Sequence, residues 1–277
     1  MAGCSSTSWL GTTLIFRCGP VYGKRQKLRL QGFNNLSKTL SLNLYDIKYC
    51  HEMPLWSDYL ARAYNAERLS GLLGDTAATI GAEILHVSRQ DYDPEGASVA
   101  MMIAEEPFHR VAGAWVAHLD KSHITAHTYP ERHPDSGICT CRLDIEVSTC
   151  GLVSPLTAMS PLIESLESPV VSLDYRIRGF TRDTHGGRHF MDHEIDSLKD
   201  FMSPLIRNRY RALHRNLPGE NLFYTRMMMR RLDPDDYLID QADRGLPEED
   251  RKTIRGLVQR EVREIYKGRP SALSYNQ

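Results

Sequence analysis

The sequence predicts an α+β fold in which an antiparallel sheet is packed with helices. Strand-like segments occur in neighbouring pairs, such as 84–90 and 97–104, with the turn sequence Asp93-Pro94-Glu95-Gly96 between them. Helical segments stand between groups of strands instead of following every strand, so a doubly wound parallel sheet is not expected. A periodic segment after Pro247 predicts a C-terminal helical extension of this fold.

The strands are predicted from apolar residues that alternate with polar ones. Leu40, Leu42 and Leu44 alternate with Ser41 and Asn43, which is the pattern of a half-buried strand. Further strands are expected at 84–90, 97–104, 114–119, 124–129, 141–147 and 171–177.

The helices are predicted from apolar residues at helical spacing. The longest runs from 56 to 73 with Ser57 or Asp58 as its cap, and a second continues from 75 to 82. Other helices are expected after Ser154-Pro155, at 192–202, at 221–232 and from Pro247 onward. The run Met227-Met228-Met229 is interpreted as helix packing.

Composition places the chain among ordinary globular proteins. Its 277 residues are 41% hydrophobic and 25% charged, and the formal net charge is −1 with both signs interspersed. A nucleic-acid or membrane-surface partner is therefore not expected.

Cysteine usage favours a reducing compartment, and we expect a cytoplasmic protein. The six cysteines form no CxxC pair and no dense framework. The apolar run 9–16 is short, is broken by Gly11, and follows no cationic residue, so it does not match a signal peptide. Residues 1–26 are weakly patterned and are interpreted as a flexible extension of a single domain that spans 27–277.

Four histidines lie close together in the centre of the chain, namely His118, His123, His127 and His133. Together with Cys139 and Cys141 they invite a metal interpretation, but no HExxH motif is present and the two thiols are separated by one residue only. We therefore predict no metal site. The spacing of Ser122 and His127 also proves nothing alone, because an odd separation in a strand places side chains on opposite faces.

The central segment 120–131 (DKSHITAHTYPE) nevertheless resembles the processing site of the S-adenosylmethionine decarboxylase proenzymes of the long bacterial type. Five further segments resemble that family in the required order. They are 28–36 (LRLQGFNNL), 144–151 (DIEVSTCG), 174–183 (DYRIRGFTRD), 192–194 (DHE) and 263–266 (REIY). The resemblance covers about residues 28 to 269.

The resemblance implies that the chain cuts itself between Lys121 and Ser122 into residues 1–121 and 122–277. Ser122 would become a pyruvoyl group that forms a Schiff base with the substrate and accepts the electron pair left by carbon dioxide. His127 matches the base for processing, and Cys150 matches the proton donor to the substrate carbon. The expected reaction makes the aminopropyl donor for spermidine from S-adenosylmethionine.

Residues that bind the substrate are predicted from chemistry and from looser analogy. A sulfonium group favours aromatic faces, so Phe33, Tyr129 and Phe180 are candidates. Glu131 is expected to bind ribose hydroxyls.

The resemblance also implies an oligomer, of about four two-chain units, with magnesium as an activator. Three alternatives stay open at this point. The chain could be a pyruvoyl-dependent ornithine or arginine decarboxylase, an uncleaved and inactive relative that acts as a binding partner, or a metal-binding module.

Overall fold

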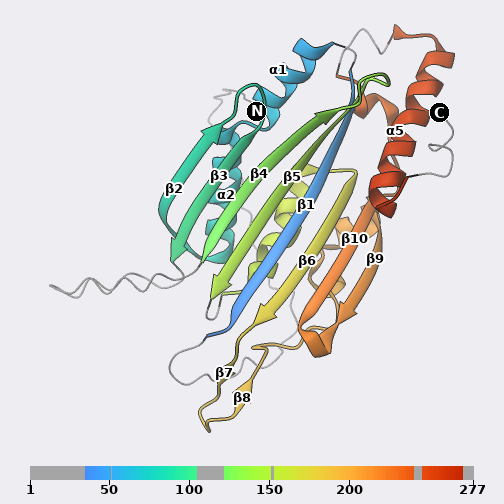
Figure 1. Cartoon of the computed structure of the whole chain (residues 1–277). Helices are drawn as coiled ribbons and strands as arrows, with labels where there is room; N and C mark the ends of the chain where they lie inside the picture. Colours follow the sequence, from blue (N-terminus) through green and yellow to red (C-terminus); the bar gives the residue numbers. More distant parts are fainter. Residues whose placement is uncertain (1–34, 51, 105–121, 151–152, 240–244, 271–277) are drawn as a thin grey trace, which may run out of the picture.

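The structure, a computed structural model, describes residues 35–50, 52–104, 122–150, 153–239 and 245–270. Its centre is an eight-stranded sheet in the order β2-β3-β4-β5-β1-β6-β10-β9, in which all the strand pairings are antiparallel (Figure 1). The strands are β1 Ser37–Tyr49, β2 Glu83–Asp91, β3 Ala97–Ala104, β4 His123–Arg132, β5 Ile138–Cys150, β6 Val170–Arg178, β9 Tyr210–Leu217 and β10 Leu222–Met229. The α+β, antiparallel prediction is confirmed.

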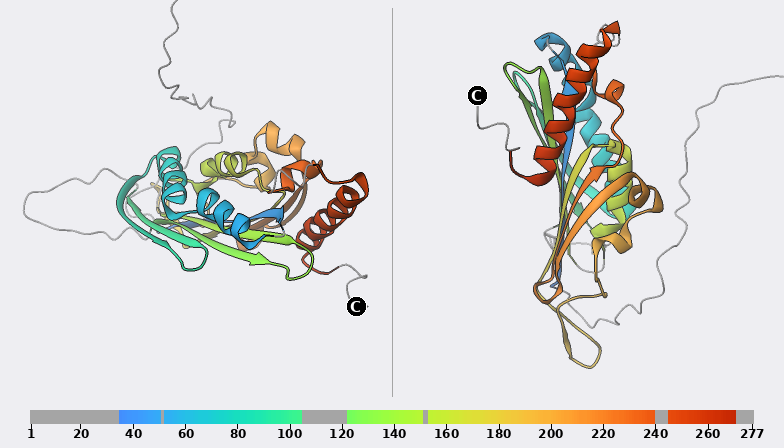
Figure 2. Two further views of the ribbon diagram at one scale, coloured as in Figure 1. Left: turned by 90° about the horizontal axis from the view of Figure 1, so that it is seen from above. Right: turned by 90° about the vertical axis from the view of Figure 1, so that its right-hand side faces the viewer.

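Helices lie mainly on one face of this sheet (Figure 2). They are α1 Met53–Ala63, α2 Ala66–Ile80, α3 Met159–Leu166 and α4 Pro204–Arg209, with the short 3-10 helices η1 Pro155–Ala158 and η2 Leu198–Phe201. The hairpin of β7 Thr181–Arg182 and β8 Arg188–His189 extends from the end of β6. No described helix is long and apolar enough to cross a membrane.

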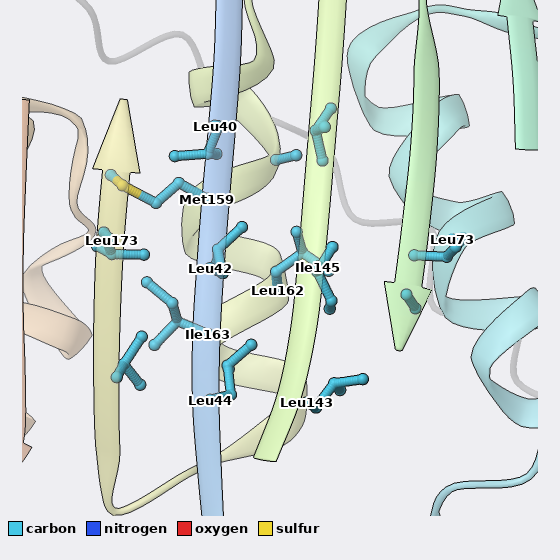
Figure 3. Packing of buried hydrophobic residues seen from close by; sticks show 14 of the residues in the cluster. Leu40, Leu42, Leu44, Leu73, Leu143, Ile145, Met159, Leu162, Ile163 and Leu173 are labelled. Carbon is cyan, nitrogen blue, oxygen red and sulfur yellow. The ribbon is translucent and has the colours of Figure 1, made fainter. Parts of the chain in front are cut away.

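The main core fills the space between the sheet and these helices. Leu40, Leu42 and Leu44 of β1 point the same way as Leu143 and Ile145 of β5, and all five are buried (Figure 3). They pack against Met159, Leu162 and Ile163 of α3 and Leu73 of α2. The alternation of the sequence therefore orients β1 and β5, because only every second side chain reaches this core.

A second, smaller core lies on the opposite face, where α5 Glu248–Lys267 covers the end of the sheet that contains the C-terminus of β1. Ile254, Val258 and Val262 of α5 are buried there with Ile47 and Val170. The rest of this face, near the start of β4, carries half-exposed polar side chains and is called the open face below.

Four predicted helices differ from the structure. The helix expected at 56–73 is two helices, because the Asn65 side chain accepts a hydrogen bond from Arg68 N at 2.8 Å and caps a new helix, α2. The helix expected at 75–82 is the second half of α2. The cap is therefore Asn65, and neither Ser57 nor Asp58 starts a helix.

The helix expected at 221–232 is the strand β10, and the prediction was wrong because this strand is buried on one face and half-buried on the other. Met227 and Met229 belong to the main core, whereas Met228 packs against the second core beside α5. An apolar run without alternation cannot be distinguished from a helix by its periodicity. The helix expected at 192–202 is irregular up to η2. The strand expected at 114–119 and the extension 1–26 lie outside the described residues.

Candidate functional site

Ser122 lies directly before β4, a strand that begins at the lower end of the sheet in Figure 1, and only 2% of this serine is exposed. Its carbonyl accepts a hydrogen bond from Ile103 N of β3 at 3.2 Å, so the neighbouring strand fixes its backbone. Lys121 lies outside the described residues. A buried serine at a strand end is shielded from bulk water, which suits attack of its hydroxyl on a neighbouring carbonyl.

Cys150 is the last residue of β5 and contacts Ser122. The backbone N–H of Cys150 donates to Ser122 Oγ at 3.2 Å, across 28 residues of sequence. The pairing of β4 with β5 produces this contact, because it sets His123 opposite Ser148 and thereby places Ser122 beside the end of β5. The nucleophile and the proton donor predicted from the sequence are thus brought together.

His127 is not brought to Ser122 within one chain. It lies opposite Asp144 of β5 and Ser98 of β3, in a β4 ladder without register shifts, and its side chain is exposed on the open face. Five residues of strand span about 16 Å, which exceeds hydrogen-bond reach. Burial raises the pKa of the facing Asp144, and the positive charges of Arg142 and of a protonated His127 oppose that rise.

Tyr129 and Glu131 lie on the same face of β4 as His127 and still farther from Ser122. Tyr129 is 48% exposed, and its ring lies 4.2 Å from the Arg142 guanidinium carbon. Glu131 is exposed and lies nine residues from Ser122, about 30 Å along a strand. His127, Tyr129 and Glu131 therefore form one row, directed away from the Ser122 of their own chain.

Phe33 lies outside the described residues, whereas Phe180 lies at the Ser122 end of the sheet. Phe180 N donates to Asn35 Oδ1 at 2.8 Å, two residues before the strand β1 that pairs with Cys150. Its ring lies 6.2 Å from that of Phe190 and is flanked by the guanidinium carbons of Arg182 and Arg188 at 5.7 and 5.6 Å. Of the aromatic candidates described, Phe180 is nearer to Cys150 along the sheet than Tyr129.

A buried ion pair lies beneath this end of the sheet, and sequence analysis missed it. Lys38 is fully buried, and its Nζ lies 2.6 Å from Asp192 Oδ2, while His193 Nδ1 lies 2.6 Å from Asp192 Oδ1. Burial alone would raise the pKa of Asp192, but hydrogen bonds from His193 and Lys38 hold it at about 2. The available signal was a lysine at a position where the β1 alternation calls for a leucine.

A second pair, also missed, lies on the open face beside Ser122. His123 Nε2 lies 3.0 Å from Glu146 Oε1, and Ser41 Oγ of β1 donates to Glu146 Oε2 at 3.4 Å. The hydrogen bond from His123 lowers the pKa of Glu146, and the charge of Arg178 acts in the same direction. His123 was considered only as a metal ligand in the sequence.

Two other kinds of site were considered, a cavity and a cluster of metal ligands. A cavity of about 260 Å³ lies between α1, α2 and the β2–β3 turn, lined by Tyr64, Asp91, Glu95 and Thr128, at the opposite end of β4 from Ser122. Among the described residues, no three histidine, cysteine, aspartate or glutamate side chains converge as metal ligands would.

Comparison with known proteins adds independent evidence. The family described as S-adenosylmethionine decarboxylase matches residues 57–179. The chain is 50% identical over 254 residues to a protein of Stenotrophomonas maltophilia named S-adenosylmethionine decarboxylase proenzyme, which covers 88% of this chain and 96% of that protein. A protein of the same name from Halorhodospira halophila is 48% identical over 259 residues, covering 88% and 95% of the two chains.

A solved adenosylmethionine decarboxylase from Aquifex aeolicus is only distantly similar, with 19% identity and a TM-score of 0.32, over 53% of this chain and 91% of that one. Half of all aligned positions are identical in the first relative, and that relative is matched over nearly its whole length. The chain belongs to the S-adenosylmethionine decarboxylase family.

Proposed function

We propose that this chain cuts itself between Lys121 and Ser122 and then decarboxylates S-adenosylmethionine with a pyruvoyl group made from Ser122. The observation that supports this most is the contact of the buried Ser122 hydroxyl with Cys150 N. The relatives named proenzymes point to the same activity.

The cut uses groups of the polypeptide and one water molecule. Ser122 Oγ attacks the carbonyl carbon of Lys121, and the peptide becomes an ester as the amide nitrogen leaves. Loss of the Ser122 α-proton then breaks the Cβ–Oγ bond, so that this oxygen leaves with residues 1–121 as a carboxylate. The dehydroalanine left at 122 takes up water and loses ammonia, which produces the ketone.

Cys150 acts in both stages through different atoms. Its backbone N–H orients the Ser122 hydroxyl before the cut. Its thiol returns a proton to the substrate carbon, and a reference pKa of about 8.5 suits that task. The pyruvoyl group supplies an electron sink for the pair released with carbon dioxide.

The base for processing is assigned to His127 of a second copy. Within one chain the paired strand β4 holds His127 about 16 Å from Ser122, so contact between them is excluded. The row of His127, Tyr129 and Glu131 on the open face can instead meet the Ser122 of another copy. This arrangement is consistent with an oligomer, of about four two-chain units as the resemblance implies.

Magnesium activation stays a prediction without a site. Mg²⁺ prefers oxygen ligands, and no suitable cluster is present among the residues described. A cytoplasmic location is likewise kept as an expectation.

The activity is tested by measuring carbon dioxide release from carboxyl-labelled S-adenosylmethionine, ornithine and arginine with one preparation of the purified protein. Release from S-adenosylmethionine alone, abolished in Ser122→Ala, is the expected result. Preferred turnover of either amino acid would overturn the substrate assignment, and turnover that persists in Ser122→Ala would overturn the chemistry.

A further inference from the structure

We propose that His123 and Glu146 form a positioning pair, which holds the new amino end of the downstream chain against Cys150 after the cut. The inference rests on the proposed self-cleavage before Ser122. It assigns a role to two residues that neither attack the peptide bond nor transfer the proton.

The geometry links the two strands that carry the reacting groups. His123 follows Ser122 directly, and Glu146 lies four residues before Cys150 on β5. The direct cross-strand partner of His123 is Ser148, so the 3.0 Å contact between His123 Nε2 and Glu146 Oε1 is a diagonal tie across the ladder. Ser41 Oγ extends this tie to β1.

The cut removes other restraints on residue 122. Before the cut, the chain holds this residue from both sides and Cys150 N–H bonds its Oγ. The elimination step transfers that oxygen to the upstream product, so this hydrogen bond is lost together with the covalent link to Lys121. The hydrogen bond from Ile103 N to the carbonyl of residue 122 remains, and free strand ends fray readily.

The His123–Glu146 pair is a side-chain tie next to the new end, and its electrostatics favour a lasting contact at neutral pH. The hydrogen bond from His123 lowers the pKa of Glu146, so the carboxylate is ionised well below neutrality. Arg178 faces the same carboxylate and adds to this effect.

The effect on rate should exceed the effect on stability. Both side chains are about two-fifths exposed, and exposed pairs of this kind contribute little to the free energy of unfolding. A small displacement of a reacting group, in contrast, can slow a reaction by about a hundredfold. A positioning role therefore predicts slower decarboxylation at nearly unchanged melting temperature.

The test compares Glu146→Gln, His123→Gln and the double variant with the control Glu167→Gln, which removes the carboxylate charge from an exposed pair with Arg209. Three quantities are measured: the fraction of chain cut, kcat with KM for S-adenosylmethionine, and the rate at which phenylhydrazine traps the ketone. The trapping rate reports the mobility and exposure of the new end without requiring turnover.

We expect all four variants to be cut as wild type is. Both pair variants should lose kcat about tenfold with little change in KM, and phenylhydrazine should trap their ketone several times faster. The kcat of the double variant should be no lower than that of the less active single variant, because the two side chains act as a unit. Ser41→Ala, a milder change, should shift kcat and trapping in the same direction by less.

Wild-type kcat and trapping rates in both pair variants would overturn the inference while leaving the proposed function intact. A preparation in which even wild type stays uncut would instead overturn the proposed function. Loss of kcat in Glu167→Gln to the same extent would show a general effect of the charge change and would also refute the pair.

Discussion

Ser122 Oγ accepts a hydrogen bond from the backbone nitrogen of Cys150 at 3.2 Å, which joins the start of β4 to the end of β5. The pairing of β4 with β5 places the Cys150 N–H, and the Ser122 hydroxyl that accepts from it is buried. It separates two functions of Cys150, since the backbone N–H acts on the hydroxyl and proton transfer is assigned to the thiol.

Cys150→Ser should therefore still be cut but should decarboxylate slowly. The variant keeps the backbone N–H that contacts Ser122 and loses the thiol, and removal of a general acid costs about a hundredfold or more in kcat. Cut fraction by denaturing electrophoresis and kcat are measured on the same sample. Unchanged kcat would remove the thiol from the reaction.

Co-expression of Ser122→Ala with His127→Ala should restore cutting to one of the two chains. Each variant alone is expected to stay intact, because one lacks the nucleophile and the other lacks the base. In mixed oligomers the His127→Ala chain keeps Ser122 and receives a base from the neighbouring Ser122→Ala chain. Mass spectrometry identifies which chain is cut; a mixture that stays wholly intact would contradict the second-copy assignment.

Lys38→Met should destabilise the protein by about 3 to 5 kcal/mol, because Asp192 then loses a buried partner. Lys38→Met combined with Asp192→Asn should recover part of this loss. Arg209→Met is the control, since its exposed pair with Glu167 is worth about 1 kcal/mol at most. Urea unfolding measures all four proteins, and equal effects of Lys38→Met and Arg209→Met would argue against the buried pair.

Acid should lower the free energy of unfolding because Asp192 becomes protonated. Its pKa is about 2 in the folded chain against an ordinary value of 3.8, so its stabilising effect is complete above pH 4 and is lost as pH falls toward 2. Relative to Asp192→Asn, wild type should lose about 1 kcal/mol of unfolding free energy between pH 6 and pH 3. If the difference in unfolding free energy between wild type and Asp192→Asn stayed constant over that range, the pKa of Asp192 would not be depressed.

The sequence predicted those strands that bury one face, and the reason is physical. Leu40 to Leu44 of β1 and the matching part of β5 show clean alternation because α2 and α3 cover that part of the sheet on one side. β10 was taken for a helix because Met228, on its other side, packs against the core beneath α5. The 192–202 segment was misjudged because Asp192 is committed to a contact with Lys38, 154 positions away. No local pattern contains such a contact.

The candidate site was also predicted only in part. Ser122, His127 and Cys150 were named from a resemblance. The contact of Ser122 with Cys150 could not be predicted, because it depends on the register of β4 against β5. Separation of His127 from Ser122 follows from the same register. Glu146 and Lys38 were missed because a charged residue in a strand is ordinarily read as a solvated or snorkelling side chain.

Self-cleavage is tested most directly by a denaturing mass spectrum of the wild-type protein as purified, beside Ser122→Ala. We expect two wild-type polypeptides, residues 1–121 with a free carboxylate and residues 122–277 with a ketone in place of the amino group, and one intact chain for the variant. A wild-type chain that stays in one piece while it decarboxylates S-adenosylmethionine would contradict the proposed self-cleavage.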